Sequence, residues 1–106
     1  MKSPERGEVW IVDLGMAAKV RPALVVSVAV LDDDRAIITI VPHTTSIRST
    51  RFEVALPVHF LKDGAFDCQN LITISRAKFQ KRLGSLKTDE MANIDAGIRR
   101  WLGLGP

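Results

Sequence analysis

The sequence predicts a mainly β protein that ends in one α-helix. Short runs rich in Val and Ile recur between turn residues through most of the chain, as in antiparallel sheets. Apolar residues at helical spacing are confined to the last part of the sequence. The chain has 106 residues, the size of about one domain, and we expect residues 1–106 to form a single domain.

Composition restricts the classes of function. The formal net charge is +3, a mild basic bias that favours polyanionic partners. Cys68 is the only cysteine and His43 and His59 are the only histidines, so we expect no internal disulfide and no zinc site. No apolar run approaches the ~20 residues of a membrane-spanning helix, and no apolar leader opens the chain. We therefore expect a cytoplasmic protein with no membrane partner.

The first predicted elements are a strand at 8–13 and a β-hairpin. The hairpin consists of apolar runs at 23–31 and 36–41, joined by an acidic reversal at 32–34. Three adjacent carboxylates favour an exposed turn. A divalent-metal site is the alternative, but consecutive acids on a turn point in different directions.

The two outer ends of the hairpin predict a phosphate-handling site. Arg21-Pro22 precedes one strand and Pro42-His43-Thr44-Thr45 ends the other, so antiparallel pairing brings them to the same edge. A fixed guanidinium beside hydroxyl side chains, with no carboxylate in either segment, is suited to holding a phosphate.

Further polar residues follow in the middle of the chain. The basic segment 46–51 predicts a flexible loop whose Arg48 and Arg51 either reach a backbone phosphate or are simply solvated. A strand is expected at 52–56, then a loop or one helical turn at 58–66. The next strand, 67–75, has a polar entrance, where Asp67 and Gln69 either share one face or cap local backbone groups.

The last part of the chain predicts a short helical turn, a small strand and the C-terminal helix. The turn falls within 76–82 and the strand within 81–86. Thr88 is the predicted N-cap, and Gly103 ends the helix. Met91, Ile94, Ile98, Trp101 and Leu102 share one face, so we expect Trp101 to pack in the core rather than to stack on a base. Arg99 and Arg100 suit the helix dipole.

Several short motifs together resemble the MazF/PemK family of toxin endoribonucleases, from type II toxin–antitoxin systems. They are R-G-E-V-W at 6–10, R-P-A-L-V-V at 21–26, V-P-H-T-T at 41–45, L-I-T-I at 71–74 and L-G-S-L at 83–86. The resemblance implies a small β-barrel with a C-terminal helix, shared with the CcdB gyrase poisons, and a homodimer. It also implies sequence-specific cleavage of single-stranded RNA without metal or cofactor, and a cognate antitoxin that occupies the RNA groove.

The resemblance also implies roles for particular residues. The essential arginine of the family falls on Arg21, its threonine on Thr44, and the following hydroxyl on Thr45. Asp67 and Gln69 only partly match the polar pair ahead of the T-I strand. The loop at 15–19 is shorter than in many relatives and lacks their acid or His.

Elementary chemistry leaves one role open. If the ribose 2′-OH is the nucleophile, the protein must accept its proton, protonate the departing 5′-oxygen and stabilise the phosphorane. Arg21 and Thr44 suit charge stabilisation, whereas His43 and Asp67 are alternative proton acceptors. Two other functions remain alternatives: a non-enzymatic gyrase poison acting through the helix end, and an RNA-binding module that grips RNA through Arg48, Arg51 and Lys78 without cutting it.

Overall fold

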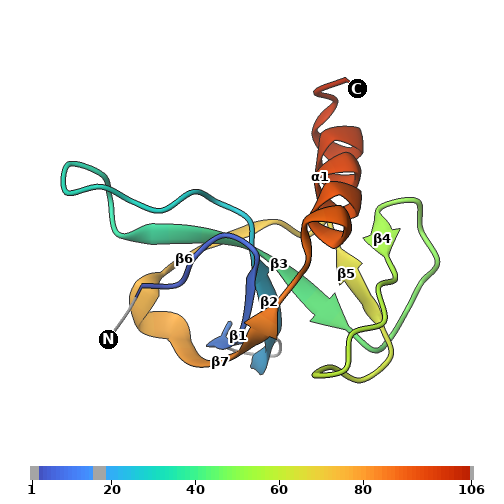
Figure 1. The fold of residues 1–106 in the computed structure, drawn as a ribbon, viewed down its shortest axis with the longest axis horizontal. Helices are drawn as coiled ribbons and strands as arrows, with labels where there is room; N and C mark the ends of the chain where they lie inside the picture. Colours follow the sequence, from blue (N-terminus) through green and yellow to red (C-terminus); the bar gives the residue numbers. More distant parts are fainter. Residues whose placement is uncertain (1–2, 16–18, 106) are drawn as a thin grey trace.

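The computed structural model describes residues 3–15 and 19–105, so most of the short loop predicted at 15–19 lies outside the described residues. It contains seven strands, one short 3-10 helix and one α-helix (Figure 1). In chain order these are β1 (Glu8–Asp13), β2 (Val20–Val25), β3 (Ile37–Thr44), β4 (Glu53–Val54), β5 (Ala65–Asp67), β6 (Ile72–Ser75), η1 (Arg76–Lys78), β7 (Phe79–Ser85) and α1 (Thr88–Leu102).

All seven strands belong to one antiparallel sheet organised around β3. The strand order is β4-β5-β3-β2-β1-β7, and β6 pairs with the first half of β3. Ile40 pairs with both β2 and β6, so these two strands lie on opposite edges of β3. The predicted mainly β fold with a C-terminal helix is confirmed. Within the described residues β4 and β7 do not pair, so the predicted barrel is an open, curled sheet.

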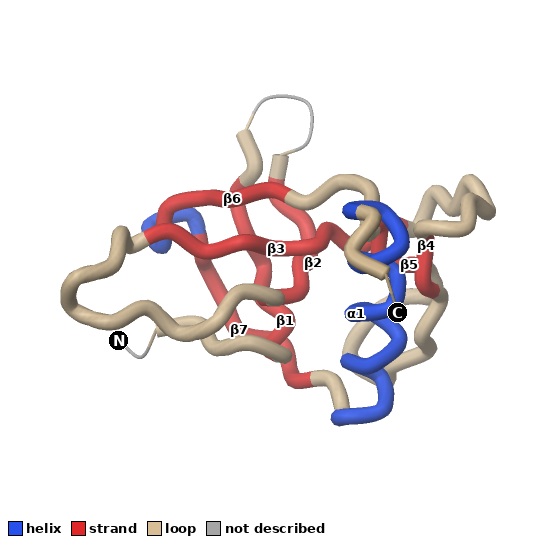
Figure 2. The backbone as a smooth tube through the Cα atoms, turned by 90° about the horizontal axis from the view of Figure 1, so that it is seen from above, coloured by secondary structure: helices blue, strands red, loops and turns tan. Residues whose placement is uncertain are grey.

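Alternation along the strands produces two apolar layers. Val9, Leu24 and Val41 are cross-strand neighbours on one face, where they join Phe66, Leu86 and Ile94. The other face is built on Trp10 and Phe79, whose rings meet edge to face 5.9 Å apart. Figure 2 shows α1 beside β4 and β5, away from the β6 and β7 end. Ile94 of α1 is buried in the first layer and not in the second.

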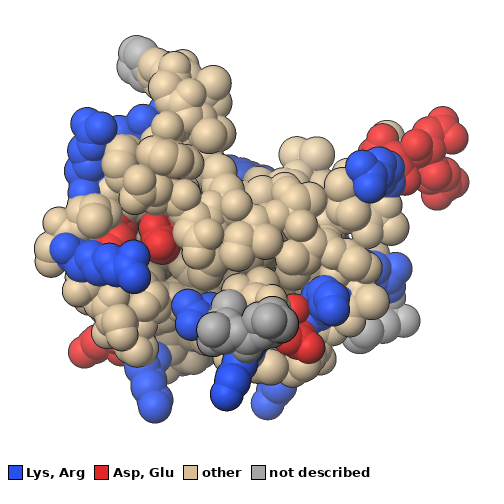
Figure 3. Space-filling view, turned by 180° about the vertical axis from the view of Figure 1, so that it is seen from behind, with Lys and Arg blue, Asp and Glu red and all other residues tan. Residues whose placement is uncertain are grey.

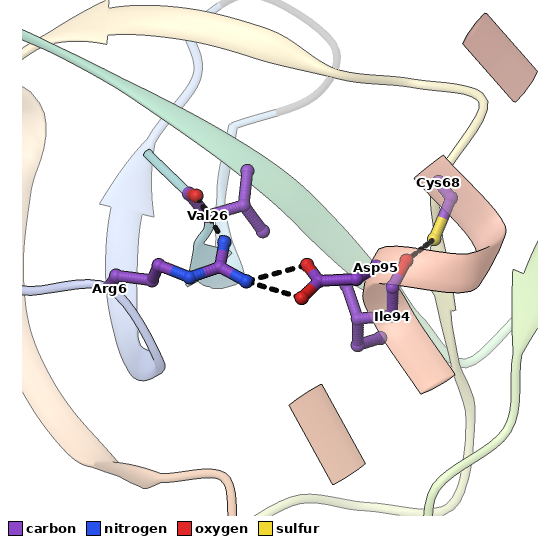
Figure 4. A network of polar contacts seen from close by, with 5 residues as sticks. All are labelled: Arg6, Val26, Cys68, Ile94 and Asp95. Atoms are coloured by element: carbon purple, nitrogen blue, oxygen red, sulfur yellow. Dashed lines mark hydrogen bonds and ion pairs between the residues drawn. The ribbon is translucent and has the colours of Figure 1, made fainter. Parts of the chain in front are cut away.

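Arg6 ties the start of the chain to the helix. One of its terminal nitrogens donates to both carboxylate oxygens of Asp95 at 2.6 Å, and the other donates to the Val26 carbonyl (Figure 4). The same part of α1 is held by Cys68, whose thiol donates to the Ile94 carbonyl across 3.7 Å. Burial raises the pKa of that thiol to about 11, so Cys68 is a packing group and not a nucleophile.

The predicted hairpin is correct in its pairing and wrong in its length. β2 ends at Val25, whereas the prediction continued to residue 31. Just beyond it, the Thr39 N–H donates to the Ser27 hydroxyl at 3.0 Å. This side chain replaces a backbone acceptor and ends the ladder. Residues 26–36 then form an arm that projects from the sheet (Figure 1).

Several other predicted boundaries need correction. The strand expected at 67–75 is two strands, because a turn stabilised by the Asp67 carboxylate separates β5 from β6. The strand expected at 52–56 is the two-residue β4. Thr88 is the first helical residue, and Lys87 is the N-cap, whose N–H donates to the Glu90 carboxylate at 2.8 Å.

The prediction that the last residues of the helix pack in the core is also wrong. Trp101 is 41% exposed and Leu102 is 50% exposed, because α1 extends past the sheet. Trp101 still makes an edge contact with Phe52, with ring centroids 5.2 Å apart.

Candidate functional site

Two prolines separate β2 from β3 at the outer end of the hairpin. Pro22 and Pro42 have no N–H to donate, and the ladder between the strands stops at the pair Ala23 and Pro42. Beyond this point β3 pairs with β5, through His43 and Thr44. The separation leaves two hollows, of about 470 Å³ and about 240 Å³, that share Arg21 and Thr44 in their linings.

Arg21 carries a buried donor without a partner. The residue before a proline is held extended, which fixes the start of the side chain. Its Nε atom is buried and makes no hydrogen bond to any described residue. Leaving such a donor unpaired costs about 1–3 kcal/mol, and more for a charged group. An anion in the hollow would supply the missing acceptor.

Thr44 and His43 are neighbours on β3, but Thr44 is partly exposed and His43 is buried. The Thr44 hydroxyl accepts a hydrogen bond from the Ser46 N–H at 3.0 Å, which orients the oxygen and leaves its own proton to donate. His43 is 4% exposed, and its ring lies edge-on to Phe66 with centroids 4.9 Å apart. Burial lowers the pKa of His43, so the imidazole is neutral at pH 7. It reaches the larger hollow only.

The smaller hollow has an acidic wall. Asp67 and Glu53 are opposite each other in the β4–β5 pair, and both line this hollow with Arg48. The Glu53 carboxylate accepts the N–H groups of Arg48 and Thr50 at 3.0 Å. These backbone hydrogen bonds, that of Thr50 first, lower the pKa of Glu53. The segment 46–51, predicted to be flexible, is therefore fixed at its centre by Glu53.

Residues 5–102 match the family model of the PemK-like, MazF-like toxins of type II toxin–antitoxin systems. The chain belongs to this family of toxins. The PemK/MazF fold is also found in an endoribonuclease from mycobacterial species, solved with its cognate antitoxin: 27% identity, TM-score 0.84, covering 98% of this chain and 99% of that one. MazF from Deinococcus radiodurans is similar too, at 25% identity and TM-score 0.81, covering 97% of this chain and 99% of that one.

The residues predicted from the PemK/MazF resemblance divide into two sets. Arg21 and Thr44 line both hollows, Thr45 and His43 line the larger one, and Asp67 and Arg48 line the smaller one. Gln69 and Arg51 line neither hollow. Their roles, like those of the other six, remain predictions.

The two residues outside the hollows are placed by local contacts. Gln69 lies in the exposed turn after β5, where its N–H donates to the Asp67 carboxylate at 3.2 Å. The Arg51 guanidinium covers the Phe52 ring at 4.6 Å, and its carbonyl accepts from Arg100. Arg100 therefore binds a loop carbonyl in addition to lying in the last turn of α1.

Several residues that line this toxin's hollows were not among the predicted site residues. Glu53 and Asn70 line the smaller hollow, and Phe60 lines the larger one. Glu53 could have been found from the sequence. A loop such as 46–51 leaves backbone N–H groups without strand partners, and Glu53 is the first carboxylate after it that can accept them. Asn70 and Phe60 gave no such indication, since each depends on how a loop crosses the sheet.

Outside the two hollows, the described residues of this toxin form one further large hollow and no cluster of metal ligands. A larger hollow of about 650 Å³ lies at the end of α1, lined by Arg99, Arg100 and small residues, away from Arg21. Across 3–15 and 19–105, no three His, Cys, Asp or Glu side chains gather as metal ligands. In the same residues, no helix has the length and apolar character needed to cross a membrane.

Proposed function

We propose that this toxin is an endoribonuclease that cleaves single-stranded RNA at specific sequences. The 2′-OH attacks the adjacent phosphorus and the 5′-oxygen leaves, giving 2′,3′-cyclic phosphate and 5′-hydroxyl ends. One observation carries the proposal: Arg21, whose buried Nε has no hydrogen-bond partner among the described residues, lines the same two hollows as Thr44. Family membership and the solved endoribonucleases of the same fold support it.

Arg21 and Thr44 would act on the charge that builds on the phosphate. A guanidinium can donate two parallel hydrogen bonds to non-bridging oxygens, and both strengthen as the phosphorane forms. Thr44 supplies one more donor, because its oxygen accepts the Ser46 N–H and its own hydroxyl proton remains free to donate. No metal ion is needed for this step, since the nucleophile belongs to the substrate and the cation to Arg21.

Proton transfer has two candidate acceptors. His43 is neutral because burial lowers its pKa, and it borders the larger hollow beside Arg21. Asp67 borders the smaller hollow, where one of its carboxylate oxygens accepts the Gln69 N–H. An imidazole is the stronger base near neutral pH. We assign the proton transfer to His43.

Two protein partners accompany this function. A cognate antitoxin is expected for a toxin of a type II system, as in the mycobacterial complex of the same fold. A second copy of the chain is the other expected partner, and size measurement in solution tests it directly.

The test is cleavage of a mixed-sequence RNA by purified protein in EDTA, with the new ends mapped by sequencing. Wild-type protein and Arg35→Ala should give 5′-hydroxyl ends at defined sequences, whereas Arg21→Ala should give few or none and Thr44→Ala should give clearly fewer than wild type. Arg35 is a matched control because it lies on the exposed arm. Equal cutting by all four proteins would refute the assignment. Intact RNA together with trapped gyrase–DNA complexes would replace it with the gyrase-poison alternative.

A further inference from the structure

The loop of residues 46–51 lines the smaller hollow although it belongs to no strand. Ser46 and Arg48 line this hollow together with Arg21 and Thr44. The Arg48 guanidinium makes no hydrogen bond or ion pair with a described residue. RNA carries a phosphate at each nucleotide, so a second arginine at this hollow suits the phosphate next to the one held by Arg21.

The centre of this loop has a backbone conformation that needs support. Ser49 has a φ of 59°, in the left-handed region that residues with a Cβ atom rarely adopt. Such a conformation persists where the surrounding contacts impose it. The position of Arg48, the residue before Ser49, therefore depends on what holds this loop.

One residue holds the loop on both sides of Ser49. The two carboxylate oxygens of Glu53 accept the Arg48 N–H at 3.0 and 3.1 Å, and one of them also accepts the Thr50 N–H at 3.0 Å. The backbone N–H of Glu53 donates to the Thr50 carbonyl at 3.2 Å. Loss of this carboxylate would leave the loop without its central acceptor.

Glu53 is itself placed by packed secondary structure. It belongs to β4 and is the cross-strand partner of Asp67 in β5. The next residue, Val54, lies close to α1, because a Cβ atom added at Gly97 would be 3.2 Å from its Cγ2 atom. Figure 2 shows α1 beside both strands. The Glu53 backbone is thus anchored to the sheet and the helix, while its side chain reaches the loop.

We propose that Glu53 is a positioning residue for RNA binding, which holds loop 46–51 in the conformation that keeps Arg48 at the smaller hollow. The inference rests on the proposed function, because Arg48 is taken to bind a phosphate of the RNA substrate. Glu53 acts through the loop backbone and takes no part in the chemical step. Without its carboxylate, the loop occupies the binding conformation for only a fraction of the time, and the apparent affinity falls by that fraction.

Three substitutions separate the reach of the side chain from its charge. Glu53→Gln keeps the length and one acceptor oxygen, Glu53→Asp keeps the charge but is one methylene shorter, and Glu53→Ala lacks both. The probe is an oligonucleotide of the mapped cut sequence, made non-cleavable by a 2′-deoxy sugar at the cut. Positioning predicts that Gln binds it within about threefold of wild type, whereas Asp and Ala bind it roughly tenfold more weakly.

A role through charge alone predicts the opposite order. A carboxylate repels a polyanion, so its removal in Glu53→Gln or Glu53→Ala would then tighten binding. The rate of cleavage at saturating RNA should stay within about twofold of wild type in all three variants, because uniform binding changes KM and not kcat. Asp34→Ala is the matched control. It removes a carboxylate that accepts a loop N–H on the exposed arm, at 2.8 Å from Leu31, and should behave as wild type.

Salt dependence and a double variant test whether Glu53 acts through Arg48. Arg48→Ala should reduce the slope of log affinity against log salt by about 0.7, the value of one phosphate contact on a single strand, and Glu53→Ala should reproduce most of this change. The double variant Arg48→Ala/Glu53→Ala should bind no more than about twofold more weakly than Arg48→Ala. If Glu53→Ala does not fold, Ser49→Pro, which cannot adopt a positive φ, should give the same loss of affinity.

Several results would overturn the proposal. They are tighter binding by Glu53→Ala, an order in which Asp resembles wild type and Gln resembles Ala, and fully additive losses in the double variant. A rate at saturating RNA that falls in Glu53→Gln as far as in Glu53→Ala would also overturn it, since Glu53 would then act in the chemical step. Wild-type protein that cuts no RNA would instead refute the proposed function.

Discussion

The two ends of the β2–β3 hairpin contrast in how their polar groups are satisfied. At the outer end, the strands separate at Pro22 and Pro42, and a buried Arg21 nitrogen is left without a partner among the described residues. At the other end, the arm of residues 26–36 carries three acids into solvent, and its acidic tip projects from the body in Figure 3. There the Leu31 N–H donates to the Asp34 carboxylate at 2.8 Å, so the turn closes on itself.

This contrast distinguishes a structural charge cluster from a chemical site. Exposed acids that are solvated and capped locally cost the fold little and require no ligand. A buried cationic donor without an acceptor costs free energy, and it persists where binding supplies the acceptor. Substitutions at the two ends should therefore have very different consequences.

The largest effect is expected at Arg21. Arg21→Ala should lower the rate of RNA cleavage by roughly 10²–10³-fold, since one preorganised donor to a charged transition state contributes about that much. Arg21→Lys should restore only a part, because an ammonium cannot make the bidentate contact. Initial rates on one mapped RNA measure both. A loss of less than threefold in Arg21→Ala, with the fold intact, would place the site elsewhere.

Thr44 should contribute a smaller share. Thr44→Val keeps the shape of the side chain and removes its donor, and should lower cleavage roughly tenfold, the value of about 1.4 kcal/mol of hydrogen bonding. Thr44→Ser should remain near wild type. If Val and Ser behave alike, the hydroxyl has no part in the reaction.

His43 should link pH to both activity and stability. Because burial lowers the pKa of His43 below its ordinary value near 6.5, its contribution to the free energy of unfolding is present above pH 6.5 and is lost as the pH falls through the lowered pKa. His43→Gln should reduce this acid-side loss and, if His43 accepts the proton, cleavage should fall as well. Urea unfolding and cleavage rates measured from pH 5 to 8 test the two effects. An unchanged acid-side slope in His43→Gln would assign the loss to other groups.

Glu53 should affect order rather than global stability. Its pKa is lowered by the Thr50 and Arg48 N–H groups, so the loop is held above pH 4.5 and released as the pH falls through the lowered value. Glu53→Ala should speed amide hydrogen exchange at positions 48 and 50 at neutral pH. The amide of Leu31 on the arm is the internal reference. Equal protection in both proteins would mean that the loop is ordered by other contacts.

The smallest effect is expected at the acidic tip. The double variant Asp32→Asn/Asp33→Asn should leave cleavage unchanged and alter the free energy of unfolding by no more than about 0.5 kcal/mol, as for most surface changes. Thermal unfolding and a cleavage assay measure it. A large loss of cleavage would show that the arm, too, takes part in function.

The sequence predicted the elements that depend on local patterns. The first strand at 8–13 agrees with β1, and the helix ends at Gly103 as predicted, where φ is 69°, although it begins one residue earlier than an N-cap at Thr88 implies. Alternation and helical spacing are properties of neighbouring residues, so they can be read without the fold. The prediction of a strand over the arm was wrong, because the end of that strand depends on a contact with a distant residue. Residues 26–31 are β-forming, but Ser27 accepts the Thr39 N–H and ends the ladder, and Val28 is 78% exposed.

The candidate site was predictable to the extent that hairpin pairing defines it. Arg21 and Thr44 share both hollows because antiparallel strands bring their outer ends together. Asp67 was correctly predicted to be near the site, although the strand predicted at 67–75 was wrong. Asp67 is instead the last residue of β5, and it lines the smaller hollow. Glu53 and Asn70 were missed because their positions depend on a two-residue strand and a turn.

The most direct test of the central claim is the NMR signal of the Arg21 Nε–H group, assigned by its loss in Arg21→Lys. On addition of an RNA oligonucleotide made non-cleavable by a 2′-deoxy sugar, we predict that this signal shifts downfield and exchanges more slowly with water, while that of Arg35 stays unchanged. Saturating RNA that leaves the Arg21 signal where it was would contradict the assignment of this buried donor to a phosphate.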